Sequence, residues 1–492
     1  MRRLFFCAVG VIFLTCSAWA GDWTPELDAY IENARVAWET PGLSVVVVRD
    51  GKVLVAKGYG VRTLGKPERV DGDTVFDIAS ISKSFTASVI ATLVDEGKMR
   101  WDDPVRRHLP TFELADPYRT QNVTIRDLLT HRTGLDRADS LFVFTEYDTA
   151  EVIRRMRFLK EREPFRNTLI YSNHGYIVAA EAAAAAAGMP FVDLVRKRLL
   201  EPLGMNDSTA GVSHVTSANH SSAHAVLAGV SQPIRDKKAM NAFGANAVNT
   251  TARDLAKWLL FHLGDGTWEG KRIISAEAMN EMHAPQIVIA TTPQFRAARG
   301  LRYFAGYGLG WQVFDYHGHP MLWHSGGADG MPTYAAILPE ERIGVAVMVN
   351  TWAAPILHGA LAGRILDTLL DRPLKDSAAE ALAMTRARPA AAEPVRTANT
   401  KPSRELAEYA GTYEDPVFGT MTVRHENGAL SLQFARGVIA DLEHWHYDTF
   451  RARWRDRAYE YADTLVTFSL DGTGRPRRLE LRMNRDLVDA VR

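Results

Sequence analysis

The chain has 492 residues, of which 46% are hydrophobic and 24% are charged, as is typical of a globular protein with a full core. This length predicts two or three domains. Lysine plus arginine equals aspartate plus glutamate, 58 each, so no net field attracts an anionic membrane or nucleic acid, and we predict no nucleic-acid partner.

The first twenty residues have the pattern of a secretory signal peptide. Arg2 and Arg3 precede an apolar segment from Leu4 to Thr15, and Ala18-Trp19-Ala20 is a small-x-small cleavage site. The apolar segment is shorter than the roughly 20 residues that a membrane-spanning helix needs. We therefore expect a signal peptide at 1–20, no stable membrane span, and a periplasmic or secreted location.

Both cysteines, Cys7 and Cys16, lie inside this segment. A lipoprotein signal around Cys16 is the weaker alternative, because Thr15 is an unusual residue before a lipidated cysteine. Removal of the signal peptide would leave a protein without cysteine. This expectation excludes disulfides, thiol catalysis and cysteine-ligated metals.

The first elements after the signal peptide are a helix and a hairpin. Thr24 is a helix cap followed by Pro25 at the first helical position, which predicts a helix to about Thr40. The β-branched runs Leu43 to Arg49 and Lys52 to Gly60 are joined at an Asp-Gly pair, which predicts a β-hairpin.

The segment Ser80-Ile81-Ser82-Lys83 places a hydroxyl three residues before an amine, and it is the only Ser-x-x-Lys in the chain. The run from Ser84 to Lys98 is apolar around much of its helical circumference, which predicts a helix inside a domain. If Ser80 opens this helix, both side chains share one face, about 5–6 Å apart at Cβ. A serine nucleophile needs a nearby base, and burial lowers the pKa of a lysine towards that role. The alternative is a capping serine and a surface lysine.

A mostly helical stretch continues to Leu263, after which strands return. The predicted late strands are Leu309 to Tyr316, Met321 to His324, Thr333 to Leu338 and Ile343 to Val349. A closing helix is expected from Ala354 to Leu370. This order predicts an α+β domain at 21–375, with an antiparallel sheet flanked by helices and a large helical subdomain.

The C-terminal part changes in composition. Residues 376–403 are rich in Ala, Pro, Thr and Arg without apolar periodicity, which predicts a linker. Six strand-like runs follow: Met421 to Arg424, Ala429 to Phe434, Ala440 to His446, Thr449 to Trp454, Thr464 to Leu470 and Leu479 to Met483. Short, evenly spaced strands predict a small all-β barrel or sandwich at 404–492.

Tyr171-Ser172-Asn173 offers partners for Ser80. A phenol relays a proton to a leaving group when a nearby ammonium stabilises its phenolate. The amide of Asn173 has donors and an acceptor that suit both Lys83 and a substrate carbonyl. The alternative is an ordinary loop tyrosine and turn asparagine.

His324-Ser325-Gly326-Gly327 follows a predicted strand, and its small residues allow a substrate backbone to approach closely. The backbone N–H of Gly327 and that of Ser80 would form an oxyanion hole. The alternative is an ordinary turn at a strand end.

Together the Ser-x-x-Lys, Tyr-x-Asn and His-x-Gly elements resemble the motif set of β-lactamases and penicillin-binding proteins, in the branch of class C β-lactamases, DD-peptidases and β-lactamase-like esterases. The resemblance covers about Trp23 to Leu374. It extends to the segments Trp101 to Val105, Thr124 to Leu135, Glu201 to Met205, Thr251 to Ala256 and Tyr307 to Trp311. The segment from Leu406 onward resembles the lipocalin-like barrel appended to such hydrolases.

The resemblance implies a β-lactamase/transpeptidase-like fold and a covalent acyl-enzyme formed on Ser80. Lys83 and Tyr171 would move protons, Asn173 would orient the substrate, and water would release the acyl group. The segment of His324, Ser325, Gly326 and Gly327 would bind the substrate and its oxyanion. We predict no metal and no cofactor.

One departure concerns the substrate. His324 stands where β-lactamases usually carry lysine, and a histidine is mostly neutral at pH 7. A neutral residue here weakens the case for efficient β-lactam hydrolysis. The resemblance of the His-x-Gly element to that of DD-peptidases implies a peptide, amide or ester substrate, and we expect a D-amino-acid peptide derived from peptidoglycan. A β-lactamase or penicillin-binding protein, an esterase and a non-catalytic binding protein remain alternatives. We make no prediction of oligomeric state.

Other residues carry weaker signals. His214, His220 and His224 suggest a metal site only loosely, because no acidic or cysteine ligand is spaced with them, and loop histidines are favoured. His131 is expected to brace a turn, and Glu201 is read as structural. Alternating arginines near the C-terminus predict a solvated strand face, with contact to an anionic wall polymer as the alternative: Arg451, Arg453, Arg455 and Arg457.

Overall fold

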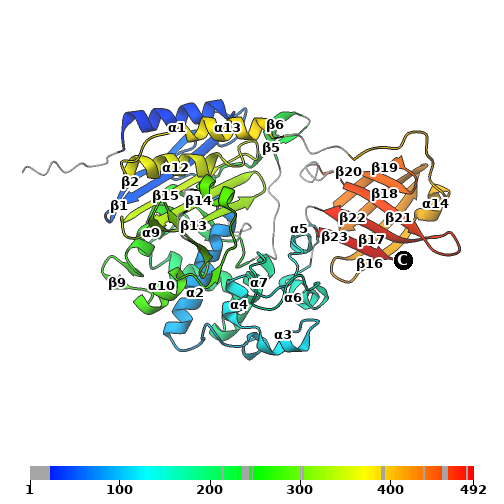
Figure 1. Ribbon diagram of the computed structural model, residues 1–492, viewed down its shortest axis with the longest axis horizontal. Helices are drawn as coiled ribbons and strands as arrows, with labels where there is room; N and C mark the ends of the chain where they lie inside the picture. Colours follow the sequence, from blue (N-terminus) through cyan, green and yellow to red (C-terminus); the bar gives the residue numbers. More distant parts are fainter. Residues whose placement is uncertain are drawn as a thin grey trace, which may run out of the picture.

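The computed structural model describes residues 23–145, 147–211, 215, 217–227, 229–234, 243–246, 248–299, 301, 304–388, 394–435, 438–456, 464–483 and 486–492. The expected signal peptide, both cysteines, His214 and Arg457 lie outside these residues. An α+β unit and a C-terminal β-barrel stand side by side along the long axis of the molecule (Figure 1).

The centre of the α+β unit is an eight-stranded antiparallel sheet in the order β10-β11-β12-β13-β14-β15-β1-β2. Its strands are β1 (Gly42–Arg49), β2 (Lys52–Gly60), β10 (Ile287–Val288), β11 (Ala305–Tyr307), β12 (Gln312–Tyr316), β13 (His319–Ala328), β14 (Met331–Leu338) and β15 (Ile343–Val349). The N-terminal hairpin therefore pairs with the late strand β15. Asp50 and Gly51 both have positive φ, 48° and 78°, which suits the two-residue turn expected there.

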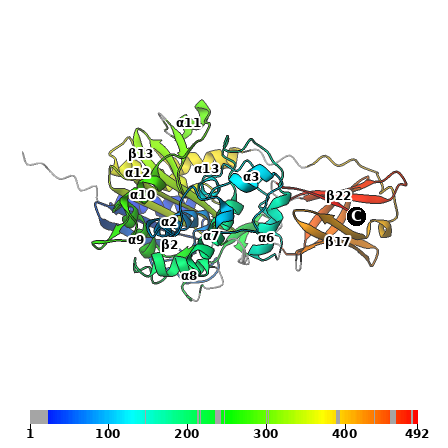
Figure 2. The same cartoon turned by 90° about the horizontal axis from the view of Figure 1, so that it is seen from below.

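Helices cover both faces of this sheet (Figures 1 and 2). Val45 and Val47 of β1 pack with α1 (Pro25–Ala37) and α12 (Leu357–Leu369). Their neighbours Val46 and Val48 face the other way and pack with α9 (Ala252–Leu263) and α2 (Ser82–Asp95). Because side chains alternate along a strand and both faces are covered, β1 reads as a continuous apolar run.

A helical subdomain adjoins the sheet. Its helices and helical turns are η2 (Val105–Arg107), α3 (Pro117–Asn122), α4 (Ile125–Leu129), α5 (Ser140–Val143), α6 (Thr149–Arg155), η3 (Met156–Phe158), α7 (Asn173–Ala187), α8 (Phe191–Val195), η4 (Arg196–Leu200) and α10 (Ala276–His283). Helix α11 (Pro293–Arg299) lies elsewhere, because its Phe295 packs with the cluster on the α1 and α12 side of the sheet. Short strands lie outside the large sheet: β3 (Phe76–Asp77), β4 (Thr209–Ala210), β5 (His224–Leu227), β6 (Val230–Pro233), β7 (Val248–Thr250), β8 (Thr267–Trp268) and β9 (Lys271–Arg272). The pair β5–β6 stands at the opposite end of the α+β unit from α3 and α4 (Figure 1).

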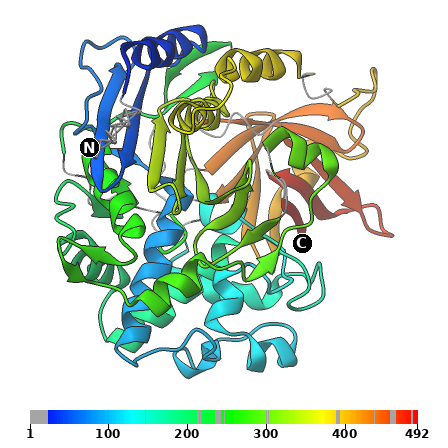
Figure 3. The same ribbon diagram turned by 60° about the vertical axis from the view of Figure 1, so that its left-hand side comes forward.

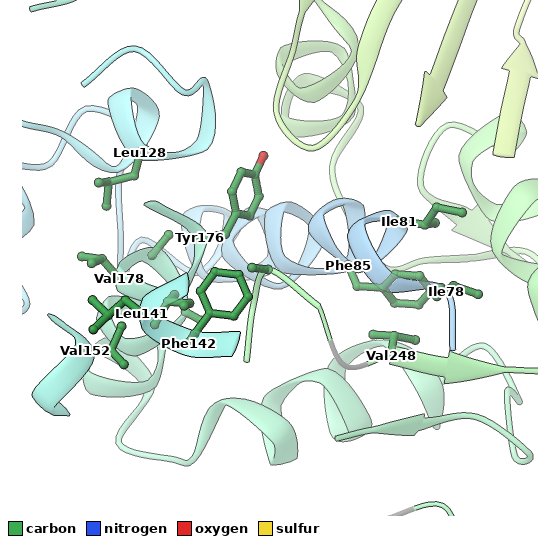
Figure 4. Close-up of a cluster of buried hydrophobic side chains, with 14 of the residues drawn as sticks. Ile78, Ile81, Phe85, Leu128, Leu141, Phe142, Val152, Tyr176, Val178 and Val248 are labelled. Atoms are coloured by element: carbon green, nitrogen blue, oxygen red, sulfur yellow. The ribbon is translucent and has the colours of Figure 1, made fainter. Parts of the chain in front are cut away.

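The core of this subdomain lies between α2, α7 and α5. All three helices contribute buried side chains: Phe142 of α5 lies on the same side of Figure 4 as Tyr176 of α7, and Phe85 lies towards the start of α2, beside Ile78, Ile81 and Val248. The helix after Ser80 is thus internal, as its apolar circumference predicts. Among the described residues, no single helix is long and apolar enough to cross a membrane; α7 and the α8–η4 segment pass that test only as a pair, bent by 78°.

The C-terminal unit is a closed barrel of eight antiparallel strands. They are β16 (Gly411–Asp415), β17 (Gly419–Glu426), β18 (Ala429–Ala435), β19 (Val438–His446), β20 (Thr449–Trp454), β21 (Thr464–Leu470), β22 (Pro476–Met483) and β23 (Asp486–Val491), preceded by α14 (Leu406–Tyr409). Pairing of β16 with β23 closes the barrel. These two terminal strands are the ones that the six predicted runs lacked, and the lipocalin-like barrel is confirmed.

The expected linker at 376–403 is not entirely irregular, and that expectation needs correction. It begins with helix α13 (Ser377–Ala387), which lies beside α1 and α12 (Figure 3). Trp38 Nε1 donates a hydrogen bond to the Ala378 carbonyl at 3.0 Å, and the Asp376 side chain caps the helix. The helix is held by contacts to residues far away in the sequence, so local periodicity did not reveal it. The domain boundaries themselves stay a prediction.

Candidate active site

Ser80 sits in a strained turn between β3 and α2. It belongs to η1 (Ala79–Ile81), a short 3-10 turn, rather than to the helix itself. Ala79 has φ 45°, in the left-handed region that non-glycine residues rarely adopt, and its N–H donates to Asp77 Oδ1 at 2.7 Å. Such strain persists only where surrounding contacts hold it, and it concentrates at functional sites.

Lys83 is completely buried one turn after Ser80 and touches three oxygen atoms. Its Nζ lies 2.9 Å from Ser80 Oγ, 2.7 Å from Asn173 Oδ1 and 2.9 Å from the Ala245 carbonyl oxygen. The amide and the carbonyl oxygens can only accept, so they take two N–H bonds of the amine. In the neutral amine, the lone pair then points to the Ser80 hydroxyl.

The environment of Lys83 favours that neutral form. Burial lowers the pKa of Lys83 well below its usual value; Asp139 opposes this effect and Arg137 adds to it. The resulting pair is a hydroxyl beside an uncharged amine, which is the arrangement that base-assisted nucleophilic attack requires.

Tyr171 and Asn173 come from the start of α7. The Ser172 hydroxyl caps this helix by accepting the Gly175 N–H, and the side chains of the two neighbouring residues both lie close to Lys83. Tyr171 is hydrogen-bonded to Ser80, and its ring centroid lies 4.9 Å from Lys83 Nζ. Burial raises the pKa of Tyr171, so the phenol keeps its proton at neutral pH.

His131 contacts the segment that carries Tyr171, Ser172 and Asn173. Its Nδ1 accepts the N–H of Ser172 at 3.1 Å, and its ring packs 4.4 Å from that of Tyr171. Burial lowers the pKa of His131 well below its usual value, so it remains a neutral brace. The expected bracing role of His131 agrees with these contacts.

His324, Ser325, Gly326 and Gly327 lie inside β13, so the expectation that they follow a strand is wrong. Pairing of β13 with β14 continues through Ala328, because glycine still supplies backbone hydrogen-bonding groups. The register with β12 stops at Trp323. From His324 onward, this edge of β13 is therefore turned to η1 and Ser80 instead of to another strand.

Gly326 brings the strand close to the nucleophile. A Cβ atom at this position would collide with Thr333 Oγ1 and with the carbonyl oxygen of Ile78, two residues before Ser80. Only a residue without a side chain allows this close approach of β13 to the turn that carries Ser80.

His324 is buried and neutral. Its Nδ1 bonds to the Ser325 carbonyl at 2.7 Å and its Nε2 to the Tyr307 hydroxyl at 3.1 Å, so Nδ1 carries the proton and Nε2 accepts. Burial is the main cause that lowers the pKa of His324 to about 3. The site has no cation at this position at neutral pH.

Sequence reasoning missed an ion pair behind Asn173. Asp139 Oδ1 accepts from Asn173 Nδ2 at 2.9 Å, and its other oxygen pairs with Arg137 at 2.6 Å. The guanidinium of Arg137 lies 5.0 Å from the centroid of the Tyr171 ring. One N–H of Asn173 is thus engaged by Asp139, and no motif spacing links these two positions. The backbone oxygen of Ala245 was also missed.

Comparison with known proteins decides the family. Residues 27–370 match the family model described as Beta-lactamase, and residues 395–490 match one described as a domain of unknown function, DUF3471. The chain belongs to the β-lactamase family. This membership confirms the resemblance drawn from the three motifs, together with the antiparallel sheet and its helices.

Several curated proteins are similar to this family member. Unguisins hydrolase ungD of Aspergillus violaceofuscus is 28% identical, over 94% of this chain and 89% of its own. Penicillin-binding protein 4 of Amycolatopsis lactamdurans is 27% identical, over 80% and 97%. The D-alanyl-D-alanine-carboxypeptidase/endopeptidase AmpH of Escherichia coli is 27% identical, over 66% and 83%.

Solved structures share the fold of this β-lactamase family member. The octameric penicillin-binding protein homologue from Pyrococcus abyssi has a TM-score of 0.62 at 22% identity, covering 95% of this chain and 99% of its own. The crystal structure of SurE has a TM-score of 0.57 at 21% identity, covering 95% and 98%. Both matches extend over the α+β unit and the barrel.

The weaker candidates find structural places in this family member. His224 is buried between the Leu64 N–H and the Asn350 carbonyl, and His220 contacts the Ser217 carbonyl. Within the described part of the chain, no group of three or more His, Cys, Asp or Glu is arranged to hold a metal ion. Glu201 pairs with Arg196.

The arginines in β20 and just after it also have local partners. Arg453 pairs with Glu443, Arg455 pairs with Asp441, and Arg451 lies over the Trp445 ring at 5.2 Å. These contacts agree with a solvated strand face of the barrel.

Proposed function

We propose that this protein is an exported serine hydrolase that cleaves a peptide, amide or ester through an acyl-enzyme on Ser80. The observation that carries the proposal is the 2.9 Å contact between the Ser80 hydroxyl and the buried amine of Lys83. The family membership supports hydrolase chemistry of this type.

Acylation begins with attack of Ser80 Oγ on the substrate carbonyl. The lone pair of Lys83 accepts the hydroxyl proton, while Asn173 and Ala245 keep the amine oriented. The carbonyl oxygen becomes an oxyanion, which the backbone N–H groups of Ser80 and Gly327 stabilise.

Collapse of the tetrahedral intermediate requires a proton on the leaving group. Tyr171 holds its proton at neutral pH and contacts Ser80, so it donates to the leaving nitrogen or oxygen. The ammonium of Lys83 then returns a proton to the phenolate. Water attacks the acyl-enzyme by the reverse of these transfers and regenerates Ser80.

We propose peptides that contain a D-amino acid, as in peptidoglycan fragments, as the favoured substrate class. Two relatives support it by name, a penicillin-binding protein and a D-alanyl-D-alanine-carboxypeptidase/endopeptidase. The neutral His324 also supports this substrate class. A neutral side chain does not attract the carboxylate of a β-lactam as a permanent cation at that position would.

The test is hydrolysis of a panel of D-peptides, L-peptides, aryl esters and penicillins by the wild type and by Ser80→Ala. The control is Ser469→Ala, an exposed serine on the barrel. We expect at least one substrate to be hydrolysed by the wild type and the control but not by Ser80→Ala. Equal hydrolysis by Ser80→Ala refutes the proposal. Failure of a fluorophosphonate to modify Ser80 in the wild type would instead favour a non-catalytic binding role.

A β-lactamase or penicillin-binding activity is the second candidate, because the matching family model is described as Beta-lactamase and one relative is named a penicillin-binding protein. A fluorescent penicillin separates the possibilities. Stoichiometric label on Ser80 with fast turnover indicates a β-lactamase, and persistent label indicates a penicillin-binding peptidase. No label after long incubation excludes both.

The export part of the proposal rests on the sequence pattern of residues 1–20. Expression of the whole gene in a Gram-negative bacterium tests it through fractionation and N-terminal sequencing. We expect periplasmic or secreted protein that begins at Gly21, and cytoplasmic protein that begins at Met1 contradicts it.

A further inference from the structure

The barrel touches the hydrolase unit at the segment that carries Arg137 and Asp139. In Figure 1, α5 lies next to β23 of the barrel, and α6 is close by. Asp139 is the residue immediately before α5. The same short stretch of chain therefore contacts Asn173 in the active site on one side and the barrel on the other.

The polar part of this contact centres on Ser140. Its backbone N–H donates to Asp486 Oδ2 of β23 at 2.6 Å, and its hydroxyl donates to the Met483 carbonyl at 3.2 Å. Ser140 is fully buried and Asp486 nearly so. No side chain within α5 caps this helix, so the carboxylate from the barrel satisfies its first N–H instead.

The apolar part is a phenylalanine at the mouth of the barrel. Phe144 is completely buried, and its ring centroid lies 6.3 Å from that of Phe434 and 6.4 Å from that of Trp454. These two residues stand at the ends of β18 and β20, on the rim that faces the hydrolase unit. Phe144, from the α+β unit, therefore packs into this end of the barrel.

A third contact lies at the turn between β16 and β17. Arg155 of α6 donates to the carbonyl oxygens of Pro416 and Val417 at 3.0 and 3.2 Å. The Tyr147 hydroxyl abuts Gly419, where a Cβ atom would collide with it. Four separate barrel segments therefore contact the stretch between Ser140 and Arg155.

We propose that the barrel is a positioning element of the active site, which holds the 137–144 segment so that Asp139 fixes Asn173 and, through it, Lys83. This inference rests on the proposed function of Ser80 and Lys83. Asp486 is its key positioning residue: it touches neither Ser80 nor Lys83, and acts through Ser140 and Asp139.

Two hydrogen bonds connect Asp139 to Lys83 through the side chain of Asn173. Asp139 holds the amide of Asn173 at 2.9 Å, and the same amide holds the amine of Lys83 at 2.7 Å. If the segment loosens from the barrel, the amide loses a fixed acceptor and the lone pair of Lys83 loses its alignment on Ser80. Misplacement of a catalytic group by about 1 Å lowers rates by about a hundredfold.

The test compares three variants of the full-length protein. Asp486→Leu removes the acceptor for the Ser140 N–H, whereas Asp486→Asn keeps an acceptor oxygen. The matched control is Asp489→Leu, three residues further along β23, where the carboxylate pairs with Arg478 on the barrel surface. The readouts are hydrogen exchange of residues 137–145, the rate of Ser80 labelling by a fluorophosphonate, and kcat and KM for a responsive substrate.

We expect Asp486→Leu to exchange faster over 137–145 and to label at least tenfold more slowly, with kcat reduced and KM within about twofold. Asp486→Asn and Asp489→Leu should stay within about twofold of the wild type. A merely structural role predicts a lower melting temperature with unchanged labelling by the folded protein, and that result overturns the inference. An equal loss in Asp489→Leu also overturns it.

A further variant, Arg155→Met, keeps the inference testable if Asp486→Leu does not fold. Arg155→Met removes the donor to Pro416 and Val417, and we expect the same faster exchange with labelling about threefold slower. The exchange readout does not depend on Ser80 chemistry. Absence of labelling in the wild type refutes the proposed function, whereas wild-type exchange in both variants refutes the positioning role of the barrel.

Discussion

Asn173 Oδ1 lies 2.7 Å from the Nζ atom of Lys83, although 90 residues separate them in the chain. This contact gives the amine its orientation, because the amide oxygen and the Ala245 carbonyl take its two N–H groups. The lone pair is left for Ser80. The predictions below follow from that geometry and from the burial of the groups around it.

Removal of the amine should abolish most of the activity. Lys83→Met leaves the Ser80 hydroxyl without a base, and we expect kcat/KM to fall by about 10²–10⁴-fold, the usual contribution of a positioned general base. Lys83→Arg should fall as far, since a guanidinium stays protonated. Steady-state kinetics of folded protein check this, and a loss below tenfold in Lys83→Met contradicts it.

The pH dependence of acylation should report on Lys83. Its pKa lies well below the usual value, and the protonated amine accepts no proton, so activity is present above that pKa and is lost as pH falls through it. His324, with a pKa of about 3, stays neutral through this range. The acid limb of a kcat/KM profile should therefore keep its position in His324→Gln. A displaced limb assigns the titration to His324 instead.

Tyr171→Phe should distinguish substrates by their leaving groups. An amide nitrogen needs a proton to depart, whereas the phenolate of an aryl ester leaves with little help. We expect kcat/KM to fall by about 10²–10³-fold for an amide and by less than about tenfold for an aryl ester. Parallel kinetics on one acyl group with both leaving groups measure the difference, and equal losses contradict proton donation by Tyr171.

The close approach of β13 to η1 should tolerate no side chain at Gly326. Gly326→Ala forces a methyl group against the Ile78 carbonyl and Thr333, and we expect a stability loss of about 1–3 kcal/mol and loss of activity. The control is Gly472→Ala, because a Cβ atom there meets nothing within 4 Å. Denaturant unfolding and kinetics give both readouts, and wild-type behaviour of Gly326→Ala contradicts the geometry.

Acid should destabilise the protein partly through His358. Burial in α12 lowers the pKa of His358 to about 4, below the value of about 6.5 in an unfolded chain. Its contribution to stability is therefore full above about pH 6.5 and is lost as pH falls towards 4, a change of about 3 kcal/mol. Between pH 7 and pH 4, the free energy of unfolding should therefore fall by about 3 kcal/mol less in His358→Leu than in the wild type.

The comparison for His358 is the same substitution at His425, which is exposed on the barrel. Urea unfolding at a series of pH values gives the free energies. An unchanged pH slope in His358→Leu contradicts the proposed burial of a neutral imidazole.

The sequence predicted those parts of the site that depend on local spacing. Ser80 and Lys83 meet because Lys83 follows Ser80 by three positions, about one helical turn, and the capped start of α7 brings Tyr171 and Asn173 together. The continuation of β13 through Gly327 was missed, since consecutive small residues look like a turn until a partner strand is known.

Asp139 and Arg137 could not be predicted, because their approach to Asn173 depends on the packing of α5 against α7 and the barrel. Helix α13 is a similar case: a buried Ala378 and a Trp38 hydrogen bond stabilise it, and both arise only in the folded protein. Long-range contacts of this kind leave no periodic signal in the chain.

The most direct test of the account is intact-mass analysis of the wild type quenched during turnover of a hydrolysed peptide or ester, followed by peptide mapping. We predict a mass increase equal to the acyl group, on the peptide that contains Ser80, and no increase in Ser80→Ala. Turnover with no acyl adduct, or an adduct on another residue, would contradict it.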